Sequence, residues 1–126
     1  MTRDGNVDNG CTTVDDEAEK RAAENESTFR HYNEEIRSTA EELDYSDAIP
    51  FICECGDASC REIVRVMPAD YENVRRTSTH FFVVAGHESR PAVFGRVVAR
   101  AGAYVVVEKT GVGADVVAER DPRRSE

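Results

Sequence analysis

Apolar residues recur at three- and four-residue steps through the first third of the chain, the spacing of an amphipathic helix. The stripe comprises Ala18, Ala22, Phe29, Tyr32, Ile36, Ala40 and Leu43. Asp15 and Asp16 provide a capping side chain and an acidic first turn, which the helix dipole favours. The pattern predicts one long helix over residues 15–43. Its larger apolar side chains pack on the domain, and its Glu, Lys and Arg side chains face solvent.

Four shorter runs in the second half of the chain have the length and β-branched composition of strands. They cover residues 61–67, 80–85, 92–100 and 103–109. Pro68 opens a short helix after the first run, and Gly102 places a hairpin turn between the last two. The run 80–85 is the most continuously apolar and is the predicted central strand. Gly111 to Gly113 predicts a turn, with a short edge strand after it.

These elements together predict an α+β fold. It has a long N-terminal helix, a cysteine loop, and then a roughly four-stranded, mostly antiparallel sheet with one short helix. The predicted organisation is a disordered polar tail (1–14), the helix and a linker (15–50), a zinc-binding α+β domain (51–118) and a second polar tail (119–126).

Composition limits the classes of protein that fit. The chain has 126 residues, of which 40% are hydrophobic and none is Trp, so its core is lean and a bound metal would help it fold. The formal net charge of -9 argues against general nucleic-acid binding. No apolar run reaches the roughly 18 residues of a membrane span, and no signal-peptide core follows Met1. We therefore expect a cytoplasmic protein that does not enter a membrane.

Three cysteines stand in the spacing C-x-C-x4-C: Cys53, Cys55 and Cys60. In a reducing compartment, thiols this close in sequence are more typical of metal ligands than of disulfide partners. Gly56 and the polar residues after it can make the reversal that returns Cys60 toward the other two thiols. A structural zinc ion takes four N or S donors, so the motif predicts zinc with one further ligand.

His87 is the predicted fourth ligand, because it follows Gly86 at the end of the most apolar run. The competing donors are His80, at the other end of that run, and Cys11 in the N-terminal tail. His31 lies on the helix and is expected to be solvated.

The charged residues around the motif have simple expected roles. Glu54 and Asp57 are expected to be solvated, although either could accept hydrogen bonds from ligand residues. Arg61 follows Cys60 directly and could offset the negative charge of a thiolate cluster. The other basic residues, Arg75, Arg90 and Lys109 among them, are interpreted as solvated faces of strands and helices.

The sequence lacks the motifs of the common zinc enzymes. It contains neither H-E-x-x-H nor the H-x-E and P-C-x-x-C pair of zinc deaminases. We therefore expect a non-enzymatic adaptor or regulator with a protein partner. The alternatives are a thiol and zinc redox sensor, since clustered thiolates can release zinc on oxidation, and a zinc-dependent hydrolase.

Two resemblances add to this interpretation. The segment from Cys53 to Arg61 resembles the post-SET zinc loop of protein lysine methyltransferases, which implies zinc ligation by Cys53, Cys55 and Cys60. The methyltransferase body is missing here, so no methyl-transfer activity is implied. From about residue 20 to residue 110 the chain is also similar to a family of small, uncharacterised bacterial proteins. The matching pieces are Asn25-Glu26, Phe29-Arg30, Asn33-Glu34, Phe51-x-Cys53-Glu54-Cys55, Cys60, Tyr71, Val74-Arg75, Phe82, Gly86-His87 and Val107-Glu108-Lys109.

Overall fold

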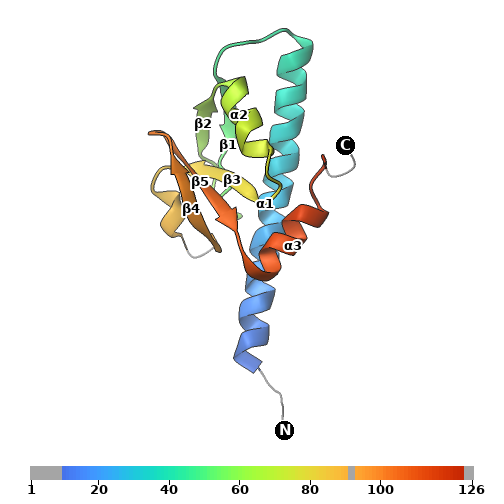
Figure 1. Ribbon diagram of the computed structural model, residues 1–126, viewed down its shortest axis with the longest axis vertical. Coiled ribbons are helices and arrows are strands. Elements are labelled where there is room, and N and C mark those ends of the chain that lie inside the picture. Colours follow the sequence, from blue (N-terminus) through green and yellow to red (C-terminus); the bar gives the residue numbers. More distant parts are fainter. Residues whose placement is uncertain (1–9, 91–92, 124–126) are drawn as a thin grey trace.

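The computed structural model describes residues 10–90 and 93–123. One long helix runs along the molecule, with the strands and the short helix α2 on one side of it and α3 crossing it (Figure 1). The elements in chain order are α1 (Gly10–Glu42), β1 (Ile49–Ile52), β2 (Ile63–Val66), α2 (Pro68–Arg75), β3 (His80–Val84), the 3-10 helix η1 (His87–Ser89), β4 (Gly95–Arg100), β5 (Tyr104–Lys109) and α3 (Gly111–Glu119).

The predicted α+β class is confirmed, with the strands divided between two small antiparallel sheets. One sheet pairs β1 with β2, and the other has the order β3-β5-β4. The linker was predicted to extend to Pro50, which is too long, because β1 begins at Ile49. The central strand of the larger sheet is β5 and not the predicted run 80–85, which forms β3. The predicted hairpin is present, and Gly102 takes the left-handed conformation at its turn (φ 78°).

The β3–β5 pair is buried on both faces, which explains the unbroken apolar runs in both strands. Phe81 and Val83 of β3 contribute to a core that also contains all three cysteines of the motif. Phe82 faces the other way, into a second core formed with β1, β2 and α2. There the Phe51 and Tyr71 rings stack with centroids 4.3 Å apart. The cysteine segment is therefore part of the hydrophobic interior.

The buried face of α1 differs from the predicted stripe. Tyr32 and Leu43, both in that stripe, are 53% and 74% exposed. The buried positions of the helix are Ala22, Ala23, Glu26, Ser27, Arg30, Asn33 and Ala40. Polar side chains make up much of this face, and Glu26, Arg30 and Asn33 each meet a specific partner in the sheets or in the C-terminal segment. Within the described ranges, no helix is both long enough and apolar enough to cross a membrane.

Both ends of the chain contain more helix than predicted. The first helix begins at Gly10, so residues 10–14 are helical, and the rest of the predicted tail lies outside the described residues. Residues 111–119 form α3 instead of a turn and an edge strand. The Glu19 carboxylate of α1 accepts the Gly113 N–H at 2.9 Å, and Val117 is fully buried in the first core. A carboxylate supplied by another helix thus stabilises the start of α3.

Candidate metal centre

The four predicted ligand residues lie together in the structure. The donor atoms of Cys53, Cys55, Cys60 and His87 are all within 4.8 Å of one another, and all four residues are buried. Three thiols and one imidazole form the donor set of a structural zinc site. The arrangement can therefore hold a metal ion.

Backbone hydrogen bonds fix the cysteine segment after β1. The Cys53 N–H donates to the Glu62 carbonyl at 3.0 Å, and the Glu54 N–H donates to the Phe82 carbonyl at 3.1 Å. The chain then reverses at Gly56, whose φ of 83° favours glycine, and the Cys60 N–H closes the turn on the Asp57 carbonyl at 2.9 Å. The predicted reversal thus brings the third thiol back to the first two.

The His87 ring reaches the cluster from the turn that follows β3. β3 ends at Val84, and Gly86 takes a left-handed conformation (φ 101°) directly before His87, which begins the 3-10 turn. Its Nδ1 lies 3.4 Å from Cys53 Sγ and 3.8 Å from Cys60 Sγ. In a regular tetrahedron with ordinary Zn–S and Zn–N bond lengths, the S to N edge is about 3.6 Å. The spacing of the donors therefore suits a tetrahedral ion of that size.

The second ring nitrogen of His87, Nε2, lies near the carboxylate of Glu62. Nε2 lies 3.8 Å from a Glu62 carboxylate oxygen, an arrangement that favours a proton on Nε2 and leaves Nδ1 free to bind a metal. Among the competing ligands, the His80 ring lies 3.5 Å from Glu108, and His31 is exposed as predicted. The side chain of Cys11 lies outside the described residues.

Two of the sulfur atoms have a hydrogen-bond donor from outside the cluster. The Val84 N–H donates to Cys53 Sγ at 3.3 Å, and Arg90 Nη1 lies 3.9 Å from Cys55 Sγ. A hydrogen bond with Cys53 lowers the pKa of the Cys55 thiol, and the same bond, together with burial, raises the pKa of Cys53. Arg61, the predicted counter-charge, instead donates to the Ala58 and Cys60 carbonyls, and Arg90 takes the position beside the sulfur.

Glu54 is buried and not solvated as expected; it is 1% exposed. Its carboxylate accepts hydrogen bonds from Asn33 Nδ2 at 2.9 Å and from the Phe82 N–H at 3.3 Å. Burial raises the pKa of Glu54 to about 7. Asn33 also donates to the Ile52 carbonyl and accepts the Ile52 N–H, so α1 binds the cysteine segment through one amide side chain.

Further buried charges occupy the α1 face, contrary to the expectation of solvated basic residues. Lys109 Nζ pairs with Glu26 at 3.0 Å, and both side chains are fully buried. Arg30 lies against the Phe81 ring and 3.4 Å from Asp121, which also pairs with Arg75. The sequence signal that could have found this face was a 3.6-residue repeat of polar residues on one side of the helix, at positions 26, 30 and 33.

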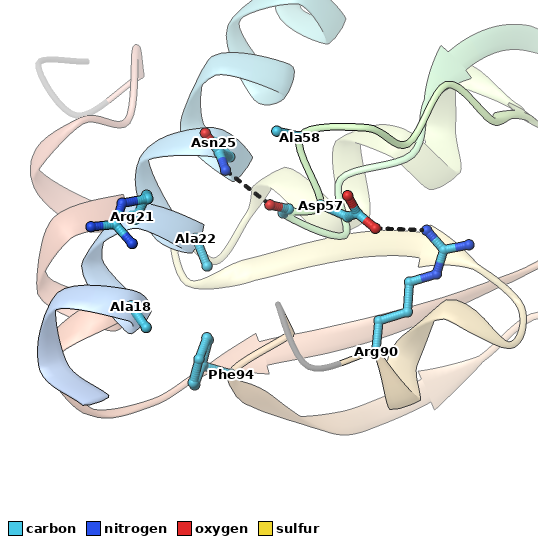
Figure 2. Close-up of a pocket in the computed structure, with 9 residues that line it drawn as sticks. Ala18, Arg21, Ala22, Asn25, Asp57, Ala58, Arg90 and Phe94 are labelled. Atoms are coloured by element: carbon cyan, nitrogen blue, oxygen red, sulfur yellow. Dashed lines mark hydrogen bonds and ion pairs between the residues drawn. The ribbon is translucent and has the colours of Figure 1, made fainter. Parts of the chain in front are cut away.

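A hollow of about 570 Å³ lies beside the cysteine loop, between the loop and α1 (Figure 2). Asn25 donates to the Gly56 carbonyl at 3.1 Å, and Arg90 Nη1 lies 3.4 Å from an Asp57 carboxylate oxygen (Figure 2). Residues that line this hollow therefore also hold the loop that carries the three cysteines of the candidate site.

The chain was compared with protein-family models, with curated proteins and with solved structures, and none of the three comparisons gave a match. The two resemblances described from the sequence remain predictions. The class of site therefore rests on the donor set and its geometry: a buried Cys₃His cluster in a small α+β protein.

Proposed function

We propose that this protein is a small zinc-binding module that acts in the cytoplasm as a non-enzymatic adaptor or regulator. The observation that carries the proposal is the buried cluster of Cys53, Cys55, Cys60 and His87, with donor atoms within 4.8 Å of one another. Zinc is favoured because it accepts thiolate and imidazole donors in a tetrahedron and needs no other ligand. The similarity of the cysteine loop to a post-SET loop supports the same metal.

A structural role for the metal is favoured over a catalytic one. Four protein donors can complete a tetrahedral coordination sphere, whereas a catalytic zinc keeps one position for water or substrate. Cys53, Cys55 and Cys60 are at most 4% exposed and His87 is 8% exposed, so a hydrolase substrate would have little access to the ion. The metal would instead crosslink the segment after β1 to the turn after β3 and stabilise the first core.

Metal analysis tests this proposal directly. Protein purified without chelators and analysed by inductively coupled plasma mass spectrometry should contain one zinc ion per chain. Replacement with Co²⁺ should give the intense d–d absorption of a tetrahedral site with thiolate ligands. Removal of the ion by a strong chelator should lower the melting temperature or abolish the folding transition.

Ligand variants give the matched control. Cys60→Ser and His87→Ala should lose the stoichiometric metal, whereas His80→Ala, at the other end of β3, should retain it. Metal-free protein that folds equally well, or a site retained in His87→Ala and lost in His80→Ala, would contradict the proposed ligand set.

A redox switch is a second candidate, favoured by the closeness of the three sulfur atoms and by the Arg90 guanidinium 3.9 Å from Cys55 Sγ. Hydrogen peroxide can oxidise two such thiolates to a disulfide, with reduction of the peroxide to water and release of the metal. Measuring zinc release with a chromogenic chelator distinguishes a redox switch from a structural site. Rapid release by peroxide, reversed by a dithiol, would support the switch, and a site inert to mild oxidant would be structural.

A further inference from the structure

The two edges of the larger sheet differ in what covers them. On the β3 side, the cysteine segment closes the edge, since Glu54 N–H donates to the Phe82 carbonyl and Val84 N–H donates to Cys53 Sγ. On the β4 side, no described strand lies beyond it, and all six of its residues are exposed. An exposed edge strand of this length is a ready template for another strand.

The direction of the backbone groups along β4 follows from the hydrogen bonds of β5. Lys109 N–H donates to the Thr79 carbonyl, so odd-numbered residues of β5 face β3, while the Tyr104 carbonyl accepts the Ala101 N–H on the β4 side. The register of β4 against β5 shifts by one residue between Val97 and Ala99. As a result, Gly95, Val97 and Arg100 all lie opposite odd-numbered residues of β5. Because opposite residues of an antiparallel pair are either both bonded or both unbonded, these three β4 residues direct their backbone groups away from the sheet.

The sequence of β4, Gly-Arg-Val-Val-Ala-Arg, is complementary to itself in an antiparallel pair. Full overlap of two copies would place Gly95 opposite Arg100 and Arg96 opposite Ala99, a long side chain opposite a small residue in each case. It would also place Val97 opposite Val98, two apolar residues that are 37% and 38% exposed in the single chain. The outward-facing backbone groups of Gly95 and Arg100 would meet at both ends of the seam.

The charges along this strand are already balanced within one copy. Arg96 pairs with Glu108 at 2.8 Å, and Arg100 pairs with Glu88 at 3.1 Å. Two copies would therefore meet without bringing unpaired arginines together, which removes the usual charge-based protection of an exposed edge.

We propose that β4 is a self-association site, at which two copies pair edge to edge and antiparallel to form one continuous six-stranded sheet. The occupant is a second copy of this chain, because the strand's pattern of side chains complements itself and its outward backbone groups match at Gly95 and Arg100. This inference does not depend on the identity of the metal or on the adaptor role.

Sedimentation velocity on the full-length, metal-loaded protein tests the inference. The wild type should show a concentration-dependent monomer–dimer equilibrium. Arg100→Pro removes an outward N–H while keeping the inward N–H of Ala101, so each dimer loses two hydrogen bonds and the dimer Kd should rise by about tenfold or more. Arg100→Gln, which keeps that N–H, is the matched control and should retain the dimer.

Val97→Lys provides a second variant that leaves the backbone intact and places like charges at the centre of the seam, so it should also favour the monomer. Melting temperature and metal content, measured on every sample, separate loss of association from loss of folding. A single monomeric species at all concentrations would overturn the inference. A dimer that neither Arg100→Pro nor Val97→Lys weakens would overturn it as well.

Discussion

At the scale of single residues, two arginines close to the cysteines have different roles. The Arg61 guanidinium is held by the Ala58 and Cys60 carbonyls, whereas Arg90 Nη1 lies 3.9 Å from Cys55 Sγ. A zinc ion bound by three thiolates and an imidazole would carry a net negative charge, so a cation beside one sulfur would stabilise the loaded site. Arg61 was the predicted counter-charge because it follows Cys60 in the sequence. In the structure Arg90 is the better candidate, because its guanidinium lies beside a sulfur atom.

Arg90→Gln should therefore lower zinc affinity by about tenfold, because it removes the cation beside the Cys55 sulfur. Competition against a chromophoric chelator measures this change. Arg61→Gln is the matched control and should leave the affinity within about twofold of the wild type, since its guanidinium contacts no sulfur. Equal losses in the two variants would show that general positive charge, and not the position of Arg90, sets the affinity.

At the scale of elements, α1 organises the fold through polar contacts more than apolar ones. Asn33 binds both backbone groups of Ile52 and the carboxylate of Glu54, and Glu26 pairs with Lys109 at the end of β5. Hydrogen bonds of this kind fix both the rotation of the helix about its axis and its position along that axis, whereas apolar packing tolerates small shifts in either. The polar face thereby fixes the position of the cysteine segment relative to β3.

Asn33→Ala should destabilise the metal-loaded protein by about 3 kcal/mol, because it leaves several buried polar groups without a partner. Urea unfolding followed by circular dichroism measures the free energy of unfolding. Thr28→Ala, an exposed substitution in the same helix, should change it by no more than about 0.5 kcal/mol. If the two variants had the same stability, the polar face of α1 would not fix the cysteine segment in the way described.

At the scale of the whole molecule, acidic groups inside the protein make stability depend on pH. Burial raises the pKa of Glu26 from 4.5 to about 7, although Lys109 lies 3.0 Å away. The folded state thus binds a proton more tightly at this carboxyl than the unfolded state does. Its contribution to stability is complete below pH 4.5 and is lost as the pH rises through about 7.

Glu26→Gln should flatten the decline in stability between about pH 4.5 and pH 7, since glutamine does not titrate, even though the buried Lys109 then loses its partner and the protein is less stable throughout. Urea unfolding of metal-loaded protein at several pH values gives the slope. Glu24→Gln, at a half-exposed position on the same helix, is the control and should keep the wild-type slope. An unchanged slope in Glu26→Gln would assign the dependence to other groups.

The sequence by itself determined the elements with strong local signals. The long helix, the strands β2, β3, β4 and β5 and the short helix after Pro68 follow from periodicity and turn residues, whereas β1 fell in the predicted linker and cysteine loop. The reversal at Gly56 and the three thiols of the motif are likewise local, and the turn at Gly86 identified His87 as the fourth donor.

Only the tertiary structure decided which face of α1 is buried and which strand is central. Glu26, Arg30 and Asn33 look like solvent-facing positions in the sequence, because their partners Lys109, Asp121 and Glu54 are distant along the chain. Contacts between residues distant in sequence also explain why α3 and the position of Arg90 beside the cluster were not predicted. The start of α3 depends on a carboxylate from α1. Local patterns report intrinsic backbone preferences, whereas a buried charge is stable only when folding supplies its partner.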